Sequence, residues 1–391
     1  MSPTTSQSPR WPLSSAVVVL ALGLVAGACG SRLLPHAGDH TRLVEAFSET
    51  AILLSLFCVG LRLGVPLEWR LWKAPVRLAT VSMLVTVVLV AGAADVFLDL
   101  SFSQALLLGA ILAPTDPVLS ADVRLPIAGD EEAARFPLVA EGALNSSLAL
   151  PMVLFALGLA GPYELGPVGV HWLLVDVGWS VAAGVALGWG TGWLAAQALE
   201  RLDGNGQIGA AEVLLVASTI VLAYGSAELC RANGFFAVLA GGYALVHGGR
   251  LRPTVRRAPR ISRRLSSLAE RVERVTELVM VGLVGALLSV SAVRPQLYVF
   301  AVAVLVAVRP IAARLGLVGL PFPEAARPAV VWFGIRGMAS VYYLAYAVDQ
   351  GLSAPLASEL TAVTLAVLAT SVVLHGLSAL PLLKRPLDQE G

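Results

Sequence analysis

The sequence contains few charged residues. Only 14% of its 391 residues are Asp, Glu, Lys or Arg, whereas about 25% is usual in soluble domains. The 27 basic and 26 acidic residues nearly cancel, and the net charge at pH 7 is +1. A soluble globular enzyme and a basic nucleic-acid-binding domain are therefore both excluded.

Groups that carry enzymatic or ATP-driven chemistry are also missing. The three cysteines, Cys29, Cys58 and Cys230, are too far apart to form a disulfide framework or a metal-ligand cluster. The five histidines are scattered and show no metal-ligand spacing, and no Gly-x-x-x-x-Gly-Lys phosphate loop occurs. We therefore expect neither a membrane-embedded enzyme nor an ATP-driven pump, and no cofactor.

Long apolar segments make up most of the chain, with 57% hydrophobic residues and a mean hydropathy of +0.78. A helix of about 20 apolar residues crosses a bilayer because it satisfies its own backbone hydrogen bonds. Such segments cover residues 12–30, 43–63, 74–98, 103–123, 134–160, 168–199, 207–229, 233–248, 272–291, 296–316, 327–348 and 357–381. We predict a single all-α polytopic membrane domain over residues 1–391, with about twelve transmembrane helices. The first segment also has features of a signal peptide, but the eleven that follow favour an uncleaved first helix.

Basic residues in the connecting loops predict the orientation of the chain in the membrane. An even number of helices puts both termini on one side. By this count that side carries 22 of the 27 basic residues, including Arg309, and the opposite side carries four. We therefore expect cytoplasmic termini. The long Arg-rich loop at residues 249–271 is predicted to be a cytoplasmic amphipathic helix, which serves either as a membrane anchor or as a lipid or partner site.

The fourth apolar segment contains a carboxylate between two prolines, in Ala113-Pro114-Thr115-Asp116-Pro117. Pro114 and Pro117 interrupt the helical hydrogen bonds and leave free carbonyl groups. These carbonyls, the Thr115 hydroxyl and the Asp116 carboxylate are the oxygen ligands that hard cations prefer. Transporters bind ions where helices break inside the membrane, so we predict an ion or proton site at Asp116. The alternative is a proline kink in which Asp116 caps a half-helix.

Two further segments contain polar residues at a similar predicted depth. Glu141 and Asn145 are four residues apart and share a helix face, which indicates either part of a site or a polar packing stripe. Arg336 lies between Gly334 and Gly337, two glycines predicted to break the eleventh helix. Because arginine keeps its charge, it needs a buried carboxylate partner. Equal depth predicts a structural ion pair between Glu141 and Arg336.

Other residues in the apolar segments have less certain roles. Asp176 and Glu277 are interpreted either as supporting groups of the site or as structural residues. Gly184, Gly188 and Gly192 form a stripe of small residues, which predicts close packing against a helix of the same chain or of a second copy.

The order of these motifs resembles the cation:proton antiporter-1 family, the NhaP-like sodium/proton exchangers. The matching stretches are residues 113–123, 141–151, 234–245, 276–288 and 333–347. The resemblance implies two inverted repeats with broken, crossing helices, and a homodimer. It assigns Asp116 as the carboxylate that holds the transported cation, with a backbone carbonyl from Thr115, support from Asn145, and Glu141 paired with Arg336.

Two differences from the family pattern stand out. We expect the chain to lack the first of the family's usual helices. It also has Asn145-Ser146 where the family has Asn-Asp, and that aspartate exchanges a proton for the cation. The predicted site therefore comprises Thr115, Asp116, Asn145 and Ser146, with Asp116 as its obvious titratable group.

Two functions remain open from the sequence. One is a secondary transporter that exchanges Na+ or K+ for protons and serves pH homeostasis. The alternative is a degenerate member of the fold that lacks exchange activity or carries another solute. In both cases we expect a protein integral to the cell membrane, such as a bacterial inner membrane, in contact with lipid and without a nucleic-acid partner.

Overall fold

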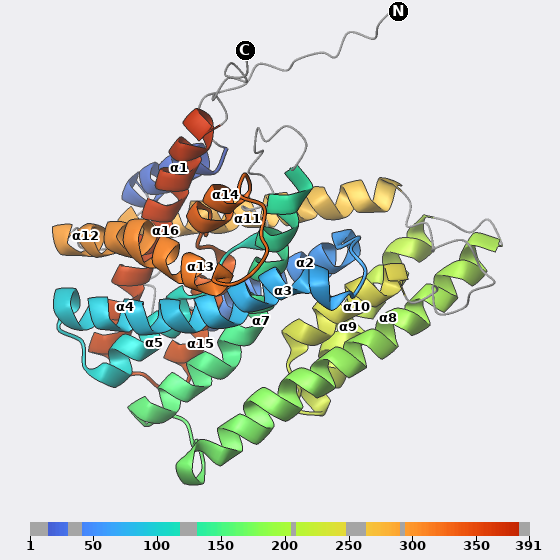
Figure 1. Cartoon of the computed structure of the whole chain (residues 1–391), viewed down its shortest axis with the longest axis horizontal. Helices are drawn as coiled ribbons and strands as arrows, with labels where there is room; N and C mark the ends of the chain where they lie inside the picture. Colours follow the sequence, from blue (N-terminus) through green and yellow to red (C-terminus); the bar gives the residue numbers. More distant parts are fainter. Residues whose placement is uncertain are drawn as a thin grey trace, which may run out of the picture.

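The structure is a computed structural model that describes residues 15–29, 41–117, 131–204, 209–247, 263–289 and 294–382, and its regular elements there are all helical (Figure 1). The helices are α1 (Ser15–Cys29), α2 (Thr41–Arg62), α3 (Trp69–Arg77) with η1 (Leu78–Ser82) and α4 (Met83–Leu98), α5 (Phe102–Leu112), α7 (Glu131–Ala160), η2 (Pro167–Gly169), η3 (Trp172–Trp179) with α8 (Ser180–Gly204), α9 (Ala210–Leu229), α10 (Gly234–His247), α11 (Arg263–Ser289), α12 (Pro295–Ala303) with η5 (Val304–Val308) and α13 (Arg309–Leu317), α14 (Arg327–Trp332), α15 (Met338–Asp349) and α16 (Ala354–Leu382). Each of the twelve predicted segments coincides with helix in this part of the chain.

Among the described residues, seven helical stretches are long and apolar enough to cross a bilayer on their own. They are Thr41–Arg62, Trp69–Leu98, Ala134–Ala160, Trp172–Arg201, Ala210–Leu229, Pro295–Leu317 and Ala354–Ser378. Three shorter apolar helices accompany them, namely α1, α5 and α10. The first helix is part of the bundle, because the backbone of Gly23 in α1 lies directly against that of Gly282 in α11.

Two predictions fall largely outside the described residues. Residues 118–130 contain the end of the fourth predicted segment, and residues 248–262 contain most of the Arg-rich loop. From Arg263 onward the predicted amphipathic helix is not a separate element, because it continues without interruption into α11.

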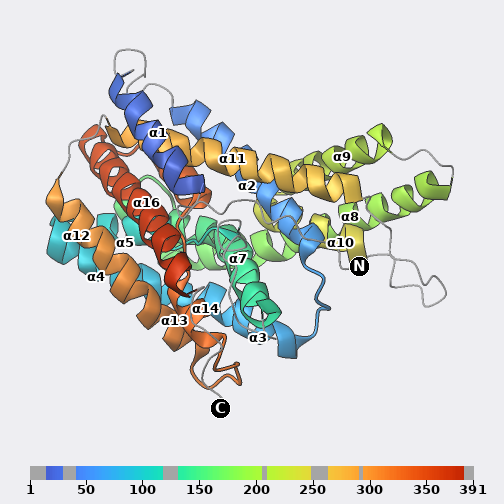
Figure 2. The ribbon, with the colours of Figure 1, turned by 90° about the horizontal axis from the view of Figure 1, so that it is seen from above.

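The helices form two groups that α2 connects. Helices α8, α9 and α10 lie together on one side, and α4, α5, α12 and α13 lie on the other (Figures 1 and 2). Helix α2 contacts α10, α11 and α15, so it connects the two groups. The broken segments that carry the predicted site lie in the second group, against α2 and α7.

The glycine stripe of α8 packs against a helix of the same chain. A Cβ atom on Gly184, Gly188 or Gly192 would collide with the backbone carbonyls of Asn233, Ala237 and Gly241, respectively. The stripe therefore allows α8 and α10 to approach closely. This face is filled within the chain and is not available to a second copy.

The helices that precede the two broken segments each contain a π-helical turn. These turns are η1, which follows Pro75, and η5, which ends directly before Arg309. A π turn inserts extra residues and rotates the side chains that follow it. The residue after η5, Arg309, is 2% exposed. Its prediction as a cytoplasmic loop residue is wrong, and the predicted cytoplasmic side keeps 21 basic residues without it.

Replacement of Gly188 by valine tests the close packing of α8 on α10. The new side chain meets the Ala237 carbonyl, and such overpacking costs about 1–3 kcal/mol. We expect a lower midpoint of thermal unfolding for the detergent-solubilised protein. Gly190→Val is the matched control, because position 190 of the same helix faces open space. Equal midpoints for the two variants would contradict the packing role.

Candidate functional site

The two broken segments lie against each other through their irregular backbones. Helix α5 ends at Leu112, and residues 333–337 separate α14 from α15. The backbone N–H of Asp116 donates a hydrogen bond of 2.7 Å to the carbonyl of Ile335. Each break therefore supplies a partner for a backbone group that the other leaves unpaired, as a low-dielectric interior requires.

Arg336 stabilises the end of α5. Its Nη1 donates to the carbonyls of Ala113 and Pro114, groups that have lost their helical partners. The positive guanidinium also lies at the negative end of the helix, which is favourable. The backbone N–H of Arg336 is held by the Ser371 hydroxyl of α16 at 3.0 Å.

The buried carboxylate Glu141 pairs with Arg309 and not with Arg336. Arg309 Nη1 and Nη2 donate to the two carboxylate oxygens of Glu141, the second at 2.9 Å. Nη2 also donates to the carbonyls of Val330 and Phe333. The predicted ion pair between Glu141 and Arg336 is thus corrected. The guanidinium of Arg309 donates two hydrogen bonds to the Glu141 carboxylate, which is a favourable geometry for this pair. Arg336 instead donates from its Nη1 to backbone carbonyl groups.

Gly334 and Gly337 provide space in addition to interrupting the helix. A Cβ on Gly334 would collide with the guanidinium of Arg309, and one on Gly337 would collide with the carboxylate of Asp116. Any larger residue at these positions would displace one of the two charged side chains. The glycines predicted from the sequence as helix breakers therefore also allow the charges to approach the backbone.

Asp116 lies at the positive end of a helix. Its side chain is buried, with the residue 3% exposed, and its Oδ2 accepts a hydrogen bond of 3.3 Å from the backbone N–H of Met338. Met338 is the first residue of α15, and the partial positive charge of a helix N-terminus favours a carboxylate there.

The neighbouring polar groups hold the irregular backbone around Asp116. Asn145 Oδ1 accepts from the Thr115 N–H at 3.1 Å, and its Nδ2 donates to the Thr115 hydroxyl at 3.0 Å. Ser146 Oγ donates to the Thr115 carbonyl at 3.3 Å. The structure therefore brings together all four residues of the predicted site. Asn145 and Ser146 contact Thr115, and their polar atoms hold the loop in place.

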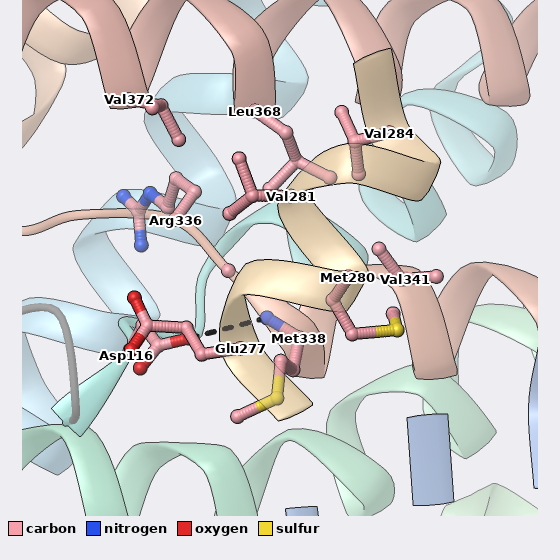
Figure 3. A pocket seen from close by; sticks show the side chains of 11 residues that line it. Asp116, Glu277, Met280, Val281, Val284, Arg336, Met338, Val341, Leu368 and Val372 are labelled. Atoms are coloured by element: carbon pink, nitrogen blue, oxygen red, sulfur yellow. Dashed lines mark hydrogen bonds between the residues drawn. The ribbon is translucent and has the colours of Figure 1, made fainter. Parts of the chain in front are cut away.

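Two small cavities border Asp116. One lies between α2 and the break, is lined by residues such as Ser55, Ser146 and Met338, and has a volume of about 10 Å³. The other is about 20 Å³ and is lined by Glu277, Arg336 and Met338, with apolar side chains around them (Figure 3). Each volume is close to that of one water-sized occupant.

Two charged residues of this region were not predicted as site residues. The count of loop charges places Arg309 on the cytoplasmic side, whereas the structure buries its side chain. Glu277 was noted as a supporting or structural residue, and it is 3% exposed at the second cavity. Its position within an apolar segment was the available signal, but only the fold shows that it faces Asp116's cavity.

A comparison with known proteins finds one family that matches nearly the whole chain. The family described as "Sodium/hydrogen exchanger, transmembrane" matches residues 2–385. The K(+)/H(+) antiporter NhaP of Alkalimonas amylolytica is 27% identical over 334 residues, which cover 82% of this chain and 54% of that protein. The chain thus spans about half the length of this curated relative.

Solved structures show the fold. A structure of the sodium proton antiporter MjNhaP1 from Methanocaldococcus jannaschii at pH 8 matches with a TM-score of 0.68 and 19% identity, over 92% of each chain. An electron-microscopy structure of the same antiporter matches with a TM-score of 0.71 and 18% identity, over 97% of this chain and 93% of that one. The expected NhaP-like, all-helical polytopic fold is confirmed.

A double-mutant cycle tests the corrected ion pair. Glu141→Gln leaves the buried charge of Arg309 unpaired, and we expect a loss of about 3–5 kcal/mol of stability. The interaction energy between Glu141→Gln and Arg309→Gln, measured from thermal or denaturant unfolding, is expected to exceed that between Glu141→Gln and Arg336→Gln. The reverse order would restore the pairing with Arg336.

Proposed function

Because the chain belongs to the sodium/hydrogen exchanger family, we propose that it is a secondary transporter that exchanges Na+ or K+ for protons across the membrane. The observation that carries this proposal is Asp116, a buried carboxylate at the crossing of two broken helices. Backbone and side-chain oxygens surround it, and a hard monovalent cation prefers such ligands.

Exchange at one carboxylate follows from competition. A proton and a metal cation cannot both neutralise the same buried charge, so each displaces the other from Asp116. An unneutralised carboxylate in an apolar interior is costly, which disfavours an empty, charged site during the transport step. In this proposal Asp116 binds the cation or the proton, and Thr115, Asn145 and Ser146 complete and position the site.

We extend the proposal to the arrangement in the membrane. In this arrangement the chain has about twelve spans and two inverted repeats. Each half of the chain contains a π turn followed by a broken segment, at residues 78–116 and 304–337. This recurrence supports the two repeats. The basic loops favour cytoplasmic termini in a cell membrane. A homodimer in which one helix group moves against the other is what the resemblance to the family implies.

The residue at position 146 supports a second candidate function. Serine has no carboxylate, and the Ser146 hydroxyl donates to the Thr115 carbonyl. A site with one fewer carboxylate holds a cation less strongly, so the chain is alternatively a degenerate member of the fold, or it carries another solute.

Proteoliposomes test the role of Asp116. We expect the parent protein to dissipate an imposed pH gradient when Na+ or K+ is added, and Asp116→Asn to fall to the level of empty liposomes, since the amide carries no charge. Asp95→Asn is the control, because Asp95 is an exposed carboxylate of α4. Full activity of Asp116→Asn would contradict the proposal.

Ser146→Asp separates the two candidate functions. If the parent is an exchanger, the added carboxylate changes the apparent KM for the cation in an activity that is already present. If exchange appears only in Ser146→Asp and is absent from the parent, the degenerate function is correct. A fluorescent pH-gradient assay over a series of monovalent cations measures both outcomes.

A further inference from the structure

A line of polar side chains runs from the end of α2 into its contact with α11. Ser55, Cys58 and Arg62 follow one another at intervals of three and four residues, so they share one face of α2. Ser55 and Cys58 are buried, whereas the side chain of Arg62 is 30% exposed. Arg62 is also the last residue of a helix that is long enough to cross a bilayer. The line therefore begins at one surface of the membrane.

Glu273 of α11 accepts hydrogen bonds from both ends of this line. Its side chain is 2% exposed. Nη2 of Arg62 donates to Oε2 of Glu273 at 2.5 Å, and the Ser55 hydroxyl donates to Oε1 at 3.3 Å. Arg62 Nε donates to the Cys58 carbonyl at 3.2 Å, which holds the guanidinium beside the carboxylate. Because seven residues of helix rise about 10 Å, Glu273 connects the membrane surface with a hydroxyl that lies well inside.

The inner end of the line reaches the candidate site. Ser55 lines the cavity of about 10 Å³ that Asp116 and Ser146 also line. Asp116 is close enough to Glu273 for the two carboxylates to interact electrostatically, as Arg62 does with Glu273 from the other side. A hydroxyl and a cavity of about one water's volume therefore lie between the two buried acids.

We propose that Glu273 and Ser55 form a proton path between the membrane surface at Arg62 and Asp116. The inference rests on the proposed exchange function, in which Asp116 gains and loses a proton although the residue is 3% exposed. It adds the route by which that proton travels. Arg62 holds the entrance, because its guanidinium covers the Glu273 carboxylate and is itself partly exposed.

Each step of the path is a transfer between oxygen atoms. A proton from water binds the Glu273 carboxylate when Arg62 turns outward. The resulting acid donates its O–H to the Ser55 oxygen, and the Ser55 O–H donates to a water molecule in the cavity, which passes a proton to Asp116. One O–H bond breaks and one forms at each step, so the net change is one proton moved from the surface to Asp116. The reverse sequence releases it.

The packing of the line favours a proton over a metal cation. A proton moves along hydrogen bonds such as the one between Ser55 and Glu273, whereas Na+ or K+ needs open space and several oxygen ligands. The positive charge of Arg62 at the entrance also repels a metal cation. Further titratable groups near Glu273 are Cys58 of α2 and, about one turn away on α11 itself, Glu270 and Glu277. Their titration is common to all the variants below, so differences between variants report on the path.

The pH dependence of exchange in proteoliposomes tests the role of Glu273. Protons are scarce at alkaline pH, so a damaged proton path limits the rate there. We expect Glu273→Gln to lower the maximal exchange rate by about tenfold or more at alkaline pH, to approach the parent at acidic pH, and to keep the apparent KM for the cation. Glu212→Gln is the control for loss of a buried glutamate, because Glu212 of α9 is 3% exposed and lines neither cavity. A rate that is unchanged, or lowered equally at every pH, overturns the proposal.

A matched pair of variants isolates the Ser55 hydroxyl. Threonine and valine have nearly the same shape and differ in the hydroxyl group. We expect Ser55→Val to show the same alkaline loss as Glu273→Gln, and Ser55→Thr to exchange much faster than Ser55→Val at that pH. Thermal unfolding of both variants checks that they are equally folded. Equal alkaline rates for the two variants overturn the proposal.

Infrared difference spectra separate this inference from the proposed function. Between alkaline and acidic pH, the purified full-length protein is expected to gain the carbonyl band of a protonated carboxylic acid, which Glu273→Gln loses and Glu212→Gln retains. A parent without a Glu273 band overturns the path. If the band is present but the parent does not exchange, the proposed function fails while proton uptake at Glu273 stands. If Glu273→Gln and Ser55→Val exchange as the parent does while Asp116→Asn is inactive, the exchanger stands and the path is wrong.

Discussion

Backbone groups inside an apolar bundle need hydrogen-bond partners, and this requirement governs the crossing of the two broken helices. Pro114 and Pro117 remove the regular partners on one side, and the segment 333–337 removes them on the other. The crossing restores them through the hydrogen bond from Asp116 N–H to the Ile335 carbonyl and through Arg336 at the end of α5. The site exists because the two breaks complete each other.

Buried charges are arranged around this crossing by the same need. Arg309 directly follows the π turn η5, and its guanidinium meets Glu141 and the carbonyls of Val330 and Phe333. The carboxylates of Asp116 and Glu277 both line the cavity of about 20 Å³ beside this crossing. The ion pair of Glu141 and Arg309 therefore belongs to the scaffold, whereas the Asp116 carboxylate borders two small cavities.

Much of the site could be predicted from local sequence. Proline beside aspartate, and arginine between glycines, are unusual in an apolar segment, so both breaks could be predicted from local sequence together with Thr115 and Asp116. Asn145 and Ser146 joined the predicted site through the resemblance to the family. The partner of Glu141 was not, because depth along each helix cannot say which of two arginines faces the carboxylate. Arg309 looked like a loop residue, since its interior position depends on a π turn that has no distinct sequence pattern.

Hydropathy and local composition determined the class of this protein by themselves: an all-helical membrane protein with about twelve apolar segments and a broken helix at Asp116. Those features are local, because a segment enters the membrane according to its own composition. The tertiary structure decided which charges pair, that the glycine stripe of α8 packs within the chain, and that Glu277 shares a cavity with Asp116. These depend on distances between helices far apart in sequence, which only the packed bundle sets.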